Sequence, residues 1–241
     1  MFGNNEDIQV ASFIEALADL LDESGILEGK SKVPFINATY QVCVSSKDKS
    51  ALVLGLKQIL LEFEIYRLNL SGHNLNKVKL SNLNFSECDL RNAKLIGADL
   101  ENINFSYSNL TGANLSESKL RSANFFGAKL IGAYLRDADL VRSNFEFADL
   151  REAKMGASNL HLANFFKADL TGSRFRGADL RNVDFSCSNL SGAILCSANV
   201  ENANFEHANI KGADFTHSIG LKSEQINKAS SVSSAHLPDN I

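Results

Sequence analysis

The most constraining feature of this sequence is a large apolar residue at every fifth position from Leu70 to Phe215. We call this residue the centre of each repeat. Five matches neither the 3.6-residue period of an α-helix nor the two-residue alternation of a β-strand. The residue two places before the centre is mostly small, the one immediately before it is mostly Asn or Asp, and Gly recurs two places after it.

This pattern predicts an extended segment that bends once per repeat. The small residue and the centre are two apart, so both lie on one face of an extended segment. Because five is odd, a straight strand would turn the next centre outward. Gly, which tolerates left-handed conformations, suits the bend, and Asn and Asp bond locally to neighbouring backbone groups. We therefore expect a coil lined by the centres and the small residues.

The phenylalanines predict how many repeats make one coil. A spacing of twenty separates the members of one ladder: Phe85, Phe105, Phe125, Phe145, Phe165, Phe185 and Phe205. Asn precedes Phe in most of these repeats, which adds an Asn ladder beside the rings. Twenty residues correspond to four repeats, so like side chains should stack at the strand spacing of about 4.8 Å.

Three strings carry a family resemblance: SNLTG at 108–112, ADLTG at 168–172 and SNLSG at 188–192. They resemble the motif of the pentapeptide-repeat family, and the resemblance covers about 150 residues. It implies an all-β fold, a right-handed quadrilateral β-helix (a solenoid) of about 7.5 coils. The handedness rests on the resemblance alone.

The repeat divides the chain into residues 1–64, 65–217 and 218–241. We expect the first segment to be a mixed or helical N-terminal cap, or a separate small recognition domain. The third should cap the last coil, because the open end of a β-helix exposes unpaired backbone. There, Ser223 is the predicted N-cap of a capping helix that runs towards Ala229.

Charge and composition limit the classes of function. Residues 1–65 have a net charge of −5, whereas residues 66–217, with sixteen acidic and seventeen basic side chains, have +1. The repeat body is therefore not basic enough to predict nucleic-acid binding. The N-terminus has no basic region before an apolar core, and no apolar run is long enough to span a bilayer. We expect a cytoplasmic, bacterial protein with free cysteines and no membrane contact.

No pattern predicts catalysis. The five histidines form neither HxxxH nor HExxH, and the glycines form no phosphate-binding loop. Cys187 and His207 are twenty residues apart and should stack, but two ligands do not make a zinc site. We therefore expect a protein that is not an enzyme, with no catalytic residue, metal, cofactor or small-molecule substrate.

Off-pattern aromatic residues give the best surface clue. Phe126 and Phe166 lie one place after a Phe centre, and Tyr107 and Phe147 lie two places after one. All four should point outward along one edge of the Phe column. A clustered aromatic surface is a candidate contact site. It could instead pack against the N-terminal segment or make a self-contact, as in a homodimer.

These observations favour a scaffold or adaptor for an unidentified protein partner. Two alternatives stay open. Some members of the family resembled here bind DNA gyrase as acidic mimics of DNA, which the neutral repeat body disfavours because DNA carries a charge about every 1.7 Å of axis. The other is a regulatory protein whose N-terminal segment provides the specificity.

Overall fold

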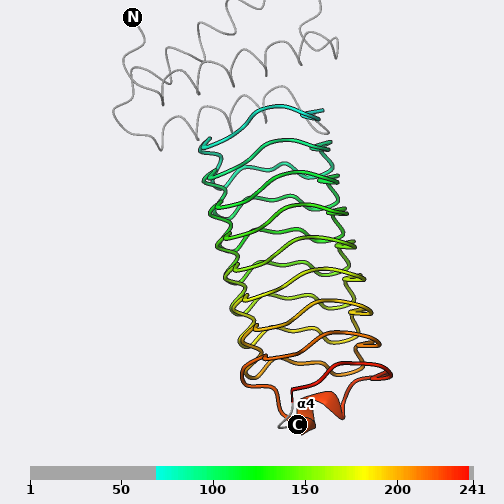
Figure 1. Cartoon of the computed structure of the whole chain (residues 1–241). Helices are drawn as coiled ribbons and strands as arrows, with labels where there is room; N and C mark the ends of the chain where they lie inside the picture. Colours follow the sequence, from blue (N-terminus) through cyan, green and yellow to red (C-terminus); the bar gives the residue numbers. More distant parts are fainter. Residues whose placement is uncertain (1–68, 239–241) are drawn as a thin grey trace, which may run out of the picture.

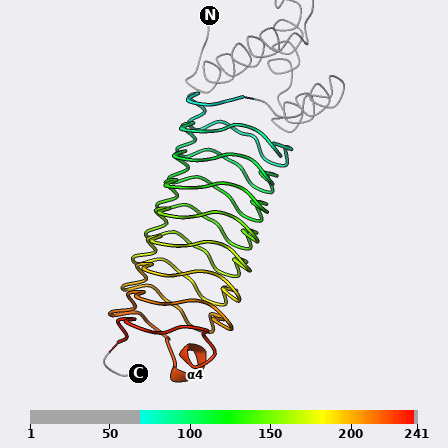
Figure 2. The same cartoon turned by 90° about the vertical axis from the view of Figure 1, so that its right-hand side faces the viewer.

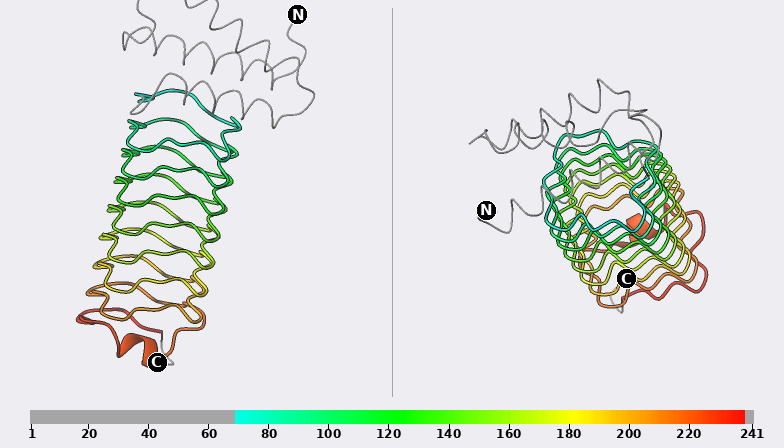
Figure 3. Two further views of the ribbon diagram at one scale, coloured as in Figure 1. Left: turned by 180° about the vertical axis from the view of Figure 1, so that it is seen from behind. Right: turned by 90° about the horizontal axis from the view of Figure 1, so that it is seen from above.

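The computed structural model describes residues 69–238, and within them the chain forms a rod of stacked coils (Figures 1 and 2). Every β-bridge from Asn69–Asp89 to Asn199–Ile219 is parallel and joins residues twenty apart. This is the register that the phenylalanine spacing predicts. Four bridge residues fall in each coil, and the view along the rod shows a four-sided outline (Figure 3). The structure predicted for residues 1–64 lies outside the described residues.

Each side of the coil is named here by its inward centre in one coil: the Leu90 face, the Leu95 face, the Leu100 face and the Phe105 face. Each face contributes one bridge residue per coil rather than an extended strand. The centres and the small residues two places before them point inward and are buried throughout the rod. The outward positions are the residue before the centre and the two residues after it.

The backbone of one repeat explains its sequence preferences. The N–H groups of Asn109, Leu110 and Gly112 donate to carbonyls of neighbouring coils at 2.7–2.9 Å, and that of Ala113 donates to Leu110 O within the turn (2.9 Å). The N–H of Thr111 has no backbone acceptor. It donates to Oδ1 of Asn109 instead, at 3.1 Å. Asn or Asp precedes the centre because its side chain satisfies the fifth N–H of the repeat.

The residue two places after each centre makes the corner, and it has a positive φ in every repeat from Leu70 to Phe215. Gly112 has a φ of +68° there, but Asn92 has 56° and Tyr107 has 58°. Glycine is the residue that adopts this conformation without strain, whereas other residues pay about 1 kcal/mol or more for it. The sequence marks the corner only where glycine fills it, yet the left-handed corner is general.

The interior is a continuous apolar column with stacked phenylalanine rings along one side. Phe145 lies between Phe125 and Phe165, with ring centroids 4.6 and 4.7 Å apart and interplanar angles of 2°. The stacking distance equals the strand spacing, so the backbone register sets it. Most inward serines fit this column because their hydroxyls bond locally, as Ser143 Oγ does by donating to Leu140 O at 2.7 Å, whereas the buried hydroxyl of Ser173 has no partner among the described residues.

The C-terminal end of the rod is closed by one short helix, α4 (Ser223–Ile226). The predicted N-cap and length are wrong: Lys222 is the N-cap, without a side-chain cap hydrogen bond, and the helix ends at Ile226 rather than near Ala229. A side-chain cap is not needed, because the N–H groups of Gln225 and Ile226 donate to Lys222 O at 3.0 and 3.4 Å.

Gln225 stands twenty residues after Phe205, where the next phenylalanine of the ladder would be. Its Oε1 accepts from the N–H of Lys222 at 2.8 Å. Its Nε2 donates to the carbonyls of Val200 (3.0 Å) and Ala203 (2.8 Å), which would otherwise face the open end of the rod. Four apolar residues cover this end: Leu221 and Ile226, which are buried, and Ala229 and Leu237, which are partly buried against the core.

Beyond α4 the chain returns to the coil. Ser231 pairs with Asn209 and His236 pairs with Asp214, each twenty-two residues apart instead of twenty. The helix therefore adds two residues to the last, incomplete coil. Pairing ends on the Leu95 face, and no bridge or named strand follows His236 within the described residues.

Candidate functional site: an aromatic edge on the rod

Four outward rings follow one corner of the rod, and we call Tyr107, Phe126, Phe147 and Phe166 the aromatic edge. They occupy the turn positions after the Phe105 face, alternating between the second and the first place after the centre. The backbone joins them in pairs: Tyr107 N–H donates to Phe126 O at 2.8 Å, and Phe147 N–H donates to Phe166 O at 3.0 Å. Neighbouring coils therefore place successive rings side by side.

The four rings form one continuous series. Tyr107 and Phe126 have centroids 5.4 Å apart, Phe126 and Phe147 5.5 Å, and Phe147 and Phe166 6.1 Å. All three contacts are edge-on, with interplanar angles between 68° and 84°. The series extends over three coil steps, about 15 Å at the usual strand spacing. Tyr107 is 62% exposed and Phe147 is 47% exposed, so half of the series faces solvent strongly.

Neighbouring residues hold the rings in place. A Cβ at Gly127 would lie 2.8 Å from the Tyr107 ring, so glycine here lets the ring lie against the backbone, as well as allowing the positive φ. The Lys167 ammonium lies 5.4 Å from the centroid of the Phe147 ring and 5.0 Å from that of the Phe166 ring. This cation–π contact places a positive charge at the C-terminal end of the aromatic edge.

A ladder of asparagines runs beside the aromatic edge. Asn124 Nδ2 donates to Asn104 Oδ1 at 3.1 Å, and Asn144 Nδ2 donates to Asn124 Oδ1 at 3.3 Å. Asn124 Oδ1 also accepts from the Phe126 N–H at 3.2 Å. The edge is therefore backed by fixed, neutral amide groups, so a partner would meet aromatic surface bordered by amides.

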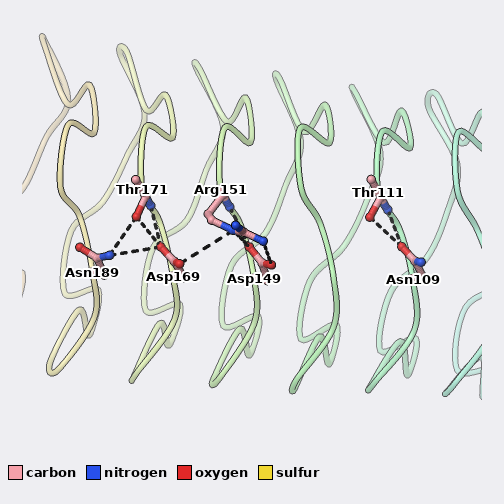
Figure 4. Close-up of polar contacts among 7 residues, drawn as sticks. All are labelled: Asn109, Thr111, Asp149, Arg151, Asp169, Thr171 and Asn189. Carbon is pink, nitrogen blue, oxygen red and sulfur yellow. Dashed lines mark hydrogen bonds and ion pairs between the residues drawn. The ribbon is translucent and has the colours of Figure 1, made fainter.

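On two other faces, arginines are neutralised by aspartates two residues earlier. The pairs are Asp89–Arg91, Asp149–Arg151 and Asp179–Arg181, with closest contacts of 2.6–2.7 Å. In each pair a side-chain hydrogen bond from the arginine is the main cause that lowers the pKa of the aspartate, against the opposing effect of burial. Figure 4 shows Arg151 in such a pair, with Asp169 of the next coil 3.9 Å from its Nε.

The described residues contain no cluster of three or more His, Cys, Asp or Glu side chains that could hold a metal ion. His161 Nδ1 lies 3.0 Å from Arg181 O, and His207 lies 3.9 Å from Glu206 at the surface. Cys187 is an exposed free thiol, and Cys88 is buried. No helix in residues 69–238 is long and apolar enough to cross a bilayer.

Sequence reasoning missed three features of the surface. It did not find Lys167 as the cation on the aromatic edge, or Gly127 as the seat of Tyr107. It also missed the cationic cluster on the Leu95 face that is described below. That cluster has a sequence signal: Arg91, Arg151 and Arg181 each follow Asp-Leu on other faces, but here arginine follows Tyr134-Leu and Arg174-Phe.

Comparison with known proteins identifies the family to which the repeat corresponds. The family model described as "Pentapeptide repeats" matches in eight copies, over residues 84–121, 118–156, 158–195 and 184–219. No curated protein sequence matches the chain.

Several solved structures resemble the chain. It is similar to a trypsin-treated QnrB1, a plasmid-mediated fluoroquinolone resistance protein, with 25% identity, 73% of this chain and 92% of that chain covered, and a TM-score of 0.41. HetL from the cyanobacterium Nostoc sp., a pentapeptide repeat protein involved in heterocyst differentiation regulation, has 25% identity over 76% of this chain and 97% of its own, with a TM-score of 0.35. A protein of the Arabidopsis thaliana thylakoid lumen has 29% identity, coverages of 54% and 72%, and a TM-score of 0.34.

Proposed function

The chain belongs to the pentapeptide-repeat family, whose model covers more than half of its length, and from this premise we propose that it is a non-enzymatic scaffold or adaptor that holds a protein partner along the aromatic edge. We infer that the rod that bears this edge is a right-handed quadrilateral β-helix of about 7.5 coils. Its task is then to present a rigid row of side chains, since the backbone hydrogen bonds of the rod do not depend on the side chains at the two outward positions after each centre.

The aromatic edge is the observation that carries this proposal. Aromatic residues are enriched in protein interfaces, and the strongest contributors cluster in contiguous patches. Solvent-exposed apolar residues are normal when scattered, but four rings in contact are not scattered. A partner that covers Tyr107 and Phe147 gains about 25 cal/mol for each Å² of apolar surface that it removes from water.

The edge is also preorganised for binding. Each ring contacts at least one neighbouring ring, and Tyr107 lies over Gly127. Ordering a free side chain at an interface costs about 0.5–1.5 kcal/mol, and rings that are already held avoid part of that cost. The Lys167 charge at one end of the row favours a partner with an acidic group beside its apolar surface.

The experiment is affinity capture with matched double variants of the full chain. We expect wild type to retain a partner that Tyr107→Ser/Phe147→Ser loses at least tenfold. The control, Leu162→Ser/Val232→Ser, removes two exposed apolar residues elsewhere on the rod and should retain the partner. Circular dichroism and thermal unfolding establish that each variant is folded. Equal partner recovery from both folded variants would contradict the proposal.

The same experiment addresses the two alternatives. A DNA mimic should recover gyrase subunits whatever the state of the aromatic edge. The Asp–Arg pairs weigh against this alternative, because each removes one negative charge from the surface. If wild type and the edge variant recover the same partner equally, and that partner is not gyrase, the specificity does not come from the aromatic edge. This is the result that the alternative based on residues 1–64 predicts.

A further inference from the structure

The Leu95 face differs from the Leu90 face in the residues that precede its arginines. Arg151 on the Leu90 face is closed onto Asp149, the residue before the centre (Figure 4). On the Leu95 face the same two places hold Tyr134 with Arg136, and Arg174 with Arg176. The backbone geometry is equivalent, but a tyrosine or a second arginine stands where the neutralising aspartate would be.

Three cations on this face therefore lack an acidic partner. Within residues 69–238, no ion pair involves Lys154, Arg174 or Arg176. Arg174 and Arg176 are both exposed. Arg136 does contact Asp137 at 3.1 Å, but both side chains are highly exposed, and such surface pairs are weak.

The register brings these residues together. Tyr134 pairs with Lys154, and Lys154 pairs with Arg174, so the three stand in one column. The Lys154 ammonium lies 3.8 Å from the centroid of the Tyr134 ring. Two places further along each repeat, a second column holds Arg136, Gly156 and Arg176. Arg136 and Arg176 are two coils apart, about 10 Å at the usual strand spacing, with the glycine between them.

Gly156 is unusual among the glycines of the described residues, because it is the one without a positive φ. The corner residue of its repeat is Ala157, which takes the left-handed conformation with a φ of 55°. A Cβ at Gly156 would meet Arg176 O at 3.4 Å, an ordinary contact. Neither backbone conformation nor packing therefore requires glycine here, and its effect is to leave a gap between two arginines.

We name Arg136, Lys154, Arg174 and Arg176, around Gly156, the Gly156 cluster. The acidic residues nearest in sequence are Asp137 and Glu152. The Glu152 carboxylate lies against Gly172, where an added Cβ would be 2.5 Å from its Oε1. No ion pair in the described part of the chain joins Glu152 to the cluster. Four cations facing two acids leave a local excess of positive charge.

We propose that the Gly156 cluster binds a phosphate monoester group, seated over Gly156 between Arg136 and Arg176. Guanidinium groups match phosphate oxygens with paired hydrogen bonds, and Lys154 adds a compact charge beside them. The charge gathers around a gap one residue wide rather than along the whole rod. This distribution suits one dianionic group better than the regularly spaced charges of a nucleic-acid strand.

This site is separate from the aromatic edge. Centres ten residues apart lie on opposite faces of a four-sided coil, so the Leu95 face is opposite the Phe105 face. Ligand at the Gly156 cluster leaves the aromatic edge uncovered, and the two sites can be tested independently. The phosphate could belong to a small molecule or to a phosphorylated side chain, since both present the same group.

The test is calorimetric titration of the full chain with three probes: inorganic phosphate, a short phosphoserine peptide and a phosphodiester oligonucleotide. We expect inorganic phosphate and the phosphoserine peptide, whose phosphate groups can become dianionic, to bind at neutral pH. The oligonucleotide should bind at least tenfold more weakly per phosphate. Tighter binding of the peptide than of inorganic phosphate would assign the site to phosphorylated proteins, and equal binding would assign it to small phosphates. Failure of both to bind at millimolar concentration, or preference for the oligonucleotide, overturns the proposal.

Two variants locate the binding. Arg174→Ser/Arg176→Ser should weaken it at least tenfold, because hydrogen bonds to charged groups are the strong ones. The control Arg91→Ser/Arg181→Ser changes the net charge by the same amount on other faces and should change affinity less than twofold. Gly156→Leu, which fills the gap without changing charge, should weaken binding about fivefold. Equal loss in both arginine variants would mean that only bulk charge is felt, and would overturn the proposal.

Discussion

The rod uses phenylalanine in two ways, inside and outside the same coils. Inside, Phe125, Phe145 and Phe165 stack with interplanar angles of 2°. Outside, Phe126 and Phe147 meet at 68°. The interior rings occupy one column of identical positions, so the register repeats their location and, for these three rings, their orientation as well. The exterior rings alternate between two columns, so each step moves sideways and neighbouring rings meet edge-on.

This difference shows how the fold separates stability from recognition. An interior ring is enclosed on all sides, and its loss leaves a cavity. An exterior ring is attached to a backbone whose hydrogen bonds do not depend on it, since the N–H groups of Tyr107 and Phe147 bond to backbone carbonyls. The exterior can therefore change its side chains while the interior keeps the rod intact. Substitutions in the interior ladder, in the asparagine ladder and in the surface ion pairs, taken in that order from the axis outward, test this separation.

The largest effect should come from the interior ladder. Phe145→Ala removes a fully buried ring between two stacked neighbours, and we expect it to lower the free energy of unfolding by about 3–5 kcal/mol. Urea denaturation followed by circular dichroism measures this change. The matched control is Phe147→Ala, two residues away and facing outward, which should cost less than about 1 kcal/mol. Similar losses in the two variants would break the distinction between the interior and the exterior.

An intermediate effect is expected in the asparagine ladder. Asn144→Ala leaves the N–H of Glu146 without its 3.1 Å acceptor and removes the bond to Asn124. The expected cost is about 1 kcal/mol. Asn144→Asp should cost less, because it keeps the acceptor, as Asp184 does in the same column. Differential denaturation of the two variants measures this, and an equal cost would mean that the turn acceptor contributes nothing.

The smallest effect is expected from the outermost ion pairs. Arg151 lowers the pKa of Asp149 chiefly through a side-chain hydrogen bond. The stabilisation is therefore present above the unfolded-state pKa of about 3.9 and is lost as pH falls through the lower folded-state pKa. Asp149→Asn should differ from wild type in unfolding free energy more at pH 7 than at pH 3. A difference that grows on acidification would show that the sign is wrong.

Asn109 makes the substitution in that last test a clean one. It occupies the same column as Asp149, and its Oδ1 accepts from the N–H two residues later. Asn at position 149 should therefore keep the turn and remove only the charge. Repeating the measurement in an Arg151→Gln background completes a double-mutant cycle, in which the pH dependence should disappear.

The sequence predicts the inside of the rod far better than the outside. The inward residues repeat because every coil presents the same space, so the spacing of Phe105 and Phe125 is enough to predict a register of twenty. The corner was predicted less fully. Gly112 marks it clearly, but Tyr107 takes the same left-handed conformation, and its side chain gives no sign of it.

The terminal helix and the surface charges depend on contacts between coils. The role of Gln225 could not be read locally, because its partners, Val200 and Ala203, lie more than twenty residues earlier. Whether an arginine is neutralised within its own repeat depends on the residue before the centre, although a neighbouring coil can also supply the aspartate, as Asp139 does for Arg121. That relation becomes visible only when Asp149-Leu-Arg151 is compared with Arg174-Phe-Arg176 in equivalent turns.

The constant register also decides which length changes the molecule can absorb. Duplicating twenty residues between the aromatic edge and α4 would lengthen the rod by one coil and leave every face in line with itself. Duplicating a single repeat of five would keep the hydrogen-bond pattern but turn all later residues by one face, a quarter of the circumference. Adding whole coils therefore changes only the height of the rod. Adding single repeats rotates every later surface about the rod axis relative to the surfaces before the insertion.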